Sequence, residues 1–260
     1  MHERPWLVRT IGGRFTYLFC ALIALMLAVP LLELGPLWTI LFVVCTSGVL
    51  VACLHAADPG RAVVRFGIGL AVVDILLGRL VAFDARPWLI IVESLLWLIT
   101  LGYVIAKLLR AVFERDRVDA QTLQAALCIY LLIGFIWIYL YALIDLSDPA
   151  SFRFQGKPNP RWTDHESRFV IFTRLFLYSF SKLTSSGYDA LTASSTLTNI
   201  CASLEALSGQ VFLTVVIARL VGLQIIQANS KEEASVDRRL DALKSDETNR
   251  HDPRKSRPTP

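Results

Sequence analysis

The chain has 260 residues, of which 54% are hydrophobic and only 18% are charged, and its formal net charge is +4. A soluble domain of this length cannot bury so much apolar surface in one core, so we expect lipid to surround most of the chain. The small positive excess is ordinary for a membrane protein with basic cytoplasmic loops, and it indicates no nucleic-acid partner.

Six apolar runs are each long enough to cross a bilayer as a helix, which takes roughly 17–25 residues. In chain order they are Phe15–Leu34, Leu37–Leu54, Val64–Phe83, Trp88–Val112, Leu123–Leu146 and Leu197–Ile226. They predict an all-α membrane protein with six transmembrane helices. A seventh run, Phe169–Phe180, contains only about a dozen residues, so it is too short to span the bilayer and fits a re-entrant segment.

The distribution of lysine and arginine predicts the orientation of these helices. Basic residues gather before the first run, between the second and third, and between the fourth and fifth: Arg4, Arg9, Arg14, Arg61, Arg65, Lys107, Arg110, Arg115 and Arg117. The two short loops on the opposite side carry only Arg86. By the positive-inside rule, both termini are cytoplasmic in a multi-pass protein of the plasma (inner) membrane. The loop Ser147–Ser167 then lies outside.

The five cysteines all lie within apolar runs, and none forms a Cys-x-x-Cys pair. An odd number of cysteines at wide spacings argues against a disulfide framework and against a zinc site. We therefore expect buried apolar cysteines and no bound metal.

The segment 229–260 is polar and differs from the rest of the chain. Val236, Leu240 and Leu243 recur at helical spacing, which predicts a short amphipathic helix that is too short to be stable alone. The remainder, with three prolines among charged residues near its end, is predicted to be largely disordered. A solvated tail and a coiled-coil assembly through this helix are both open.

Ionisable residues occur within the first four runs: Glu33, Asp74, Arg79 and Glu93. Charges at membrane depth are costly and usually pair inside a helix bundle. The sequence favours an ion pair of Arg79 with Asp74 or Glu93 that joins neighbouring helices. A proton or substrate pathway is the alternative. No run repeats arginine at every third position, so a voltage sensor of the usual kind is excluded.

The stretch "FLYSFSKLTSSGYDALTASS" (176–195) places a polar, hydroxyl-rich loop at membrane depth. Non-helical backbone is tolerated there only where protein buries it or where it lines water. A re-entrant helix from Arg168 to about Thr184, followed by a polar loop and then the last span, is the arrangement of a pore loop.

From the fifth span onward, the chain resembles the pore domain of potassium channels, in particular the small six-transmembrane bacterial members of the two-transmembrane ion channel family. In that family a pore helix of the form Y-F-S-F-V-T-L-T-T leads into a filter T-x-G-Y-G-D; this chain reads "LYSFSKLTSSGYDAL". Its last span, "LEALSGQVFLTVVIARLVGLQI", is similar to the inner helix of the same group. The first four spans match only in number.

The resemblance implies a homotetrameric channel in membrane lipid that conducts cations, potassium above all, without a cofactor and without enzyme activity. It assigns an ion-selectivity filter to Thr184, Ser185, Ser186, Gly187, Tyr188 and Asp189. It further assigns filter support to Lys182 and Glu205, and inner-helix gating or packing to Gly209 and Gly222. Rings of backbone carbonyls replace the hydration shell of the ion in such a filter. Ser185 would add a ring of hydroxyls, and Gly187 would take a positive φ.

The implied domains are a cytoplasmic N-terminus (1–14), a four-helix peripheral region (15–117), a pore domain (118–228) and the polar tail (229–260). The pore domain would consist of outer helix, pore helix, filter loop and inner helix.

The filter departs from the family pattern in two ways that bear on function. Either Asp189 occupies the place of the second glycine and forms a carboxylate ring that concentrates cations, or the glycine is missing together with the outermost carbonyl ring. Lys182 stands where the family has threonine. These departures leave a second function open, that of a non-conducting channel-like membrane protein with a structural or regulatory role. The chain contains no HExxH or nucleophile motif, so a membrane enzyme is disfavoured.

Overall fold

The computed structural model describes residues 14–29, 36–57, 61–83, 86–113, 120–160, 162, 165–188 and 190–250. Within these ranges the protein is mostly helical, in agreement with the predicted class, and it adds one small three-stranded sheet. The chain divides into two compact units, one formed by Met1–Arg115 with Asp119–Val216 and the other by Asp116–Val118 with Ile217–Pro260.

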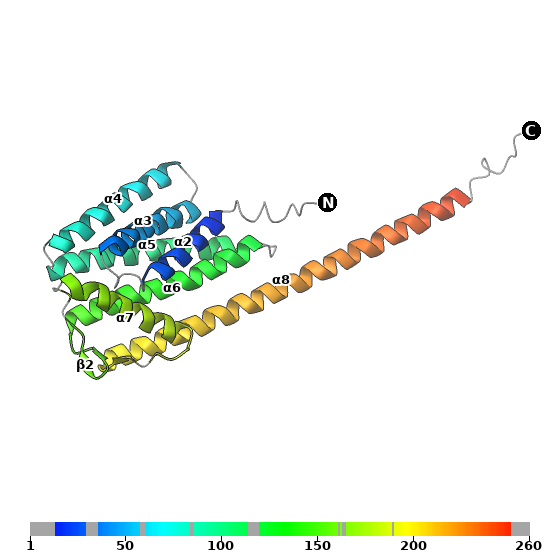
Figure 1. Ribbon diagram of the computed structural model, residues 1–260. Coiled ribbons are helices and arrows are strands. Elements are labelled where there is room, and N and C mark those ends of the chain that lie inside the picture. Colours follow the sequence, from blue (N-terminus) through cyan, green and yellow to red (C-terminus); the bar gives the residue numbers. More distant parts are fainter. Residues whose placement is uncertain are drawn as a thin grey trace, which may run out of the picture. The chain divides into compact units, whose positions relative to one another are not determined.

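The first four helices follow four of the six predicted apolar runs. They are α2 (Arg14–Ala28), α3 (Pro36–Ala57), α4 (Arg61–Phe83) and α5 (Pro87–Phe113). Proline occupies the first position of α3 and of α5, where its missing N–H costs nothing. Helix α3 packs against α2, α4 and α5, and α2 also packs against α6 (Ala120–Ser147) (Figure 1).

The remaining elements of the first unit surround the polar loop. Helix α6 is followed by β1 (Phe152–Phe154) and β2 (Lys157–Pro158), then by α7 (His165–Leu183), β3 (Leu191–Ala193) and α8 (Thr196–Arg250). The strands form an antiparallel sheet in the order β2-β1-β3, with Phe152 opposite Ala193 and Phe154 opposite Leu191. The sheet therefore joins the two chain segments that flank α7 and its loop.

Three of the described helices are long and apolar enough to cross a membrane: Pro87–Phe113, Gln121–Ser147 and Thr196–Arg219. The apolar stretches of α2, α3 and α4 are shorter, namely Phe15–Ala28, Val44–Cys53 and Ile68–Gly78. Three of the six predicted spans thus meet this criterion among the described residues, and the other three stay predictions.

Helix α8 continues beyond the last apolar run as far as Arg250, in the second unit. The tail from residue 229 to residue 250 is therefore helical, in place of the largely disordered segment that its charge content suggested. Starting a helix is the costly step, whereas adding residues to an existing helix is not. Because the tail extends a helix that the apolar segment has already formed, it needs no nucleus of its own.

Candidate functional site

The candidate filter loop begins where α7 ends, and the helix ends in a specific hydrogen-bonded turn. The amide of Ser185 donates to the carbonyl of Lys182 at 3.1 Å, and the amide of Ser186 donates to the carbonyl of Ser181 at 2.9 Å. Ser185 has φ 54°. These features define a Schellman motif, with Ser185 in the left-handed position that glycine usually occupies.

The other two carbonyl groups of the last turn of α7 are also bonded. The amide of Thr184 donates to the carbonyl of Phe180 at 3.0 Å, and its hydroxyl donates to the same oxygen at 2.7 Å. The hydroxyl of Tyr130, on α6, donates to the carbonyl of Leu183 at 3.1 Å. A helix normally leaves its last four carbonyl groups without partners. Here all four have a donor from the same chain, so the start of the loop is firmly fixed.

The backbone of the loop alternates in the sign of φ. Gly187 has φ 78°, as the sequence analysis expected, and Ser185 has φ 54°. Among the described non-glycine residues only Gln155 and Ser185 have a positive φ, so Ser186 and Tyr188 do not. Ser186 and Tyr188 thus differ from Ser185 and Gly187 in the sign of φ. Asp189 lies outside the described residues.

The side chains of the loop are open to their surroundings in a single chain. Thr184, Ser185, Ser186 and Gly187 are exposed, whereas Tyr188 is half-buried and packs against the core. Helix α8 holds the loop at its base, because Gln210 Nε2 donates to Ser185 Oγ at 3.2 Å. The sequence analysis assigned no role to Gln210, since apolar periodicity carries no information about a contact between two polar side chains.

Gly209 lies directly against the end of α7. A Cβ atom at this position would overlap the carbonyl oxygen of Leu183 and would lie 3.0 Å from Leu183 Cδ1. The absence of a side chain therefore permits the close approach of α8 to α7. Gly222, in the second unit, has open space around its Cβ position, so no such contact requires a glycine there.

Glu205 is fully buried and joins three helices. Tyr141 of α6 donates its hydroxyl to Glu205 Oε2 at 2.6 Å, and Ser179 of α7 donates to Oε1 at 2.5 Å. The Ser179 hydroxyl also lies 3.0 Å from the carbonyl of Gly134. The predicted supporting role of Glu205 thus has a geometric basis, but neither Tyr141 nor the contact of Ser179 was identified from the sequence.

Lys182, the second predicted support, is half-buried beside Tyr178. Its Nζ atom lies 5.2 Å from the centre of the Tyr178 ring, within the range of a cation–π interaction. The positive charge also acts on the buried carboxylate of Glu205. Lys182 therefore lies beside an aromatic ring, two residues before the exposed part of the loop.

The sheet fixes the far end of the loop. The amide of Gln155 donates to the carbonyl of Ala190 at 2.9 Å, directly before β3 pairs with β1. Arg174 of α7 lies over the ring of Phe154 in β1, 3.6 Å from its centre. The sequence analysis missed this sheet because strands of two or three residues are too short to show alternation.

Two of the charged residues in the earlier helices have described partners, whereas the predicted ion pair of Arg79 with Asp74 or Glu93 lies outside the described side chains. Trp97 of α5 donates its indole N–H to Asp74 Oδ1 at 2.9 Å, and both side chains are buried. Glu93 acts electrostatically on Arg168, at the start of α7. The side chain of Arg79 and all of Glu33 lie outside the described part of the structure. Among the described side chains, the bond from Trp97 to Asp74 links α4 to α5.

Comparison of the chain with protein-family models, with curated proteins and with solved structures finds no match.

Proposed function

We propose that this protein is the subunit of a homotetrameric cation channel, and that potassium crosses the membrane passively along the loop Thr184–Asp189. The observation that carries this proposal is the form of the loop. It follows the 19-residue helix α7, exposes three hydroxyl side chains in a row and has positive φ at Ser185 and Gly187 but not at Ser186. In the proposed filter the carbonyl oxygens of this loop would face the ion and replace its hydration shell.

In this proposal the chain crosses the inner membrane six times, α7 is re-entrant, and both termini lie in the cytoplasm. Helices α5, α6 and α8 have the required length and hydropathy. Support for the re-entrant helix comes from its neighbours. Helix α7 packs against α6, and the loop after it is held by Tyr130 and Gln210, which come from two of these long helices.

The tetramer is supported by the exposed surface of α8. Only 22% of the apolar segment Thr196–Arg219 is buried within one chain, compared with 44% of Gln121–Ser147. Five apolar side chains recur at alternating spacings of three and four residues and are each about half exposed: Leu197, Ile200, Leu204, Leu207 and Val211. Such a stripe is typical of a helix that packs against other helices. Identical chains around an axis would supply them, with the loop of each chain facing the axis.

Ser185 has a specific role in this proposal. Its hydroxyl is exposed and accepts a hydrogen bond from Gln210, which leaves one lone pair and the hydroxyl proton available. Four such hydroxyls would form the innermost ring of oxygens, and four Gln210 amides would hold them in place. The ion would pass from this ring to the carbonyl groups of the loop without any covalent step.

A non-conducting channel-like protein is the second candidate, and the position of Lys182 favours it. An ammonium group beside the Tyr178 ring lies only two residues before Thr184, and positive charge close to the path opposes cation entry. In this alternative the same loop and helices would serve a structural or regulatory role.

Purified protein in liposomes separates the two candidates. A potassium gradient should drive flux through the wild-type protein that exceeds sodium flux, and Asp189→Gly should preserve or increase the selectivity for potassium. Intact tetramers that pass neither ion would refute the channel and leave the non-conducting role. Lys182→Thr tests the charge, because its removal should increase potassium flux if the loop conducts.

A further inference from the structure

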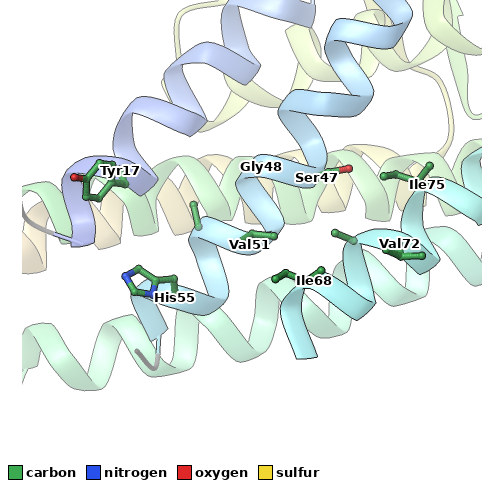
Figure 2. Close-up of a pocket in the computed structure, with 10 residues that line it drawn as sticks. Tyr17, Ser47, Gly48, Val51, His55, Ile68, Val72 and Ile75 are labelled. Atoms are coloured by element: carbon green, nitrogen blue, oxygen red, sulfur yellow. The ribbon is translucent and has the colours of Figure 1, made fainter. Parts of the chain in front are cut away.

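An apolar groove of about 550 Å³ lies between α2, α3 and α4, away from the loop (Figure 2). Its walls include Val51 from α3 and Ile68, Val72 and Ile75 from α4. Two of these side chains, Ile68 and Val72, are about half exposed, so the groove is open to the surroundings of the protein. Its size falls within the range of pockets that bind small molecules, roughly 300–1,000 Å³.

The surface of the groove is almost entirely apolar, and its two ends differ in the residues that surround them. Figure 2 shows Tyr17 and His55 at one end, whereas Ile75 lies near the other. Arg65 precedes Ile68 by three residues, so it lies on the same face of α4, and its side chain is exposed. Helices α2 and α4 begin toward the end with Tyr17 and His55, each with an arginine as its first residue, and α3 ends there. Basic residues thus gather at one end of the apolar groove.

The length of the groove matches one leaflet of a bilayer. Along α3 the lining extends from Ser47 to His55, which corresponds to about 12 Å at 1.5 Å per residue. The hydrocarbon of one leaflet is about 15 Å thick, half of the whole core. The basic end belongs to the cytoplasmic side by the positive-inside rule. Ser47, near the Ile75 end of the groove, has a buried hydroxyl oxygen for which the described residues supply no hydrogen-bond partner.

We propose that this groove binds one acyl chain of an anionic phospholipid of the inner leaflet, with the lipid phosphate beside His55, Tyr17 and Arg65. Basic pockets between membrane helices on the cytoplasmic side bind anionic headgroups in this way. The inference rests on the proposed placement of α2, α3 and α4 in the membrane, and it does not require ion conduction.

Native mass spectrometry of the full-length protein in a non-ionic detergent tests the site, with phosphatidylglycerol and phosphatidylcholine as probes. The wild-type chain should retain phosphatidylglycerol at lower concentrations than phosphatidylcholine. Gly48 lines the groove, and its Cβ position has no atom within 4 Å. Gly48→Leu should therefore fill the groove without disturbing the helices and should weaken lipid binding about tenfold, as loss of contact for two methylene groups predicts.

Gly102→Leu is the matched control, because Gly102 also has open space around it but lies on α5, outside the groove. It should leave lipid binding unchanged. Arg65→Gln should lower the preference for the anionic lipid about fivefold, whereas Arg110→Gln, an exposed arginine in the last turn of α5, should not. Equal retention of phosphatidylglycerol by Gly48→Leu and the wild type would overturn the proposal, as would equal effects of the two arginine variants. Lipid binding by a protein that passes no ions would uphold this site while refuting the channel.

Discussion

The hydroxyl of Tyr141 donates a 2.6 Å hydrogen bond to Glu205 Oε2, and both side chains are fully buried. Ser179 completes the cluster from α7, so one carboxylate joins α6, α7 and α8 directly behind the candidate filter. A buried carboxylate is costly unless it is bonded, and this cluster bonds both of its oxygens. We infer that it fixes the position of α7, and hence of the loop that α7 carries.

Replacing Glu205 should show how strongly this cluster holds the helices together. Glu205→Ala leaves the hydroxyl of Tyr141 without its acceptor, at a cost of about 1–3 kcal/mol, whereas Ser179 can still donate to the carbonyl of Gly134. The midpoint of thermal unfolding in detergent should fall accordingly. Glu205→Gln keeps one acceptor oxygen and should cost less. Equal midpoints for Glu205→Ala and the wild type would refute the supporting role.

The two glycines of α8 that the sequence analysis singled out should respond in opposite directions. Gly209→Ala forces a methyl group into the backbone of Leu183, and overpacking of this kind costs about 1–3 kcal/mol. Gly222→Ala has space and should stabilise the helix by up to about 1 kcal/mol, the difference in helix propensity. Thermal unfolding and potassium flux should both decline for the first variant only. A neutral Gly209→Ala would contradict the close contact between α7 and α8.

Substitution of Ser185 should raise the stability of the protein and lower its selectivity for potassium. Its φ of 54° is unfavourable for a residue with a side chain, so Ser185→Gly should stabilise the protein by about 1 kcal/mol. The same change removes the hydroxyl that Gln210 holds, so the ratio of potassium to sodium flux in liposomes should fall. Ser186→Gly serves as the control, because Ser186 is exposed and has no positive φ, and it should bring no gain in stability. Unchanged selectivity in Ser185→Gly would show that this hydroxyl does not line the ion path.

The bond from Trp97 to Asp74 should be important for the packing of α4 on α5. Trp97→Phe leaves the buried carboxyl group of Asp74 without its donor, which costs about 1–3 kcal/mol. Trp88→Phe, on the same helix, is the control, since Trp88 is 56% exposed. If thermal unfolding detects no difference between the two variants, Asp74 has another partner that replaces the indole.

The sequence predicted the elements of the fold better than the contacts between them. Apolar runs locate helices because lipid and core both select for such runs, and the abrupt change to hydroxyl residues after Lys182 located the polar loop. Gly187 was predicted to have a positive φ because glycine permits it. The same φ at Ser185 was not predicted, since serine rarely adopts it and the hydrogen bonds of the helix end impose it.

The sequence did not predict the hydrogen-bond partners of the buried polar groups. The sequence favoured a pair of Arg79 with Asp74 or Glu93, which stays a prediction because the Arg79 side chain is not described, and it did not predict the bond of Asp74 to Trp97 on another helix. Glu205 was expected to support the filter, but its partners were not predicted: Ser179 on α7, and Tyr141, which is 64 residues away in the chain. Periodicity shows which face of a helix is apolar, but it does not show which neighbouring helix covers that face.

Electron cryo-microscopy of the full-length protein in lipid nanodiscs tests the central claim most directly. We expect four chains around one axis, with residues Thr184–Tyr188 of each chain facing a continuous central passage that contains density for cations in potassium buffer. A monomer, or a tetramer in which protein seals these loops away from any passage, would contradict the account.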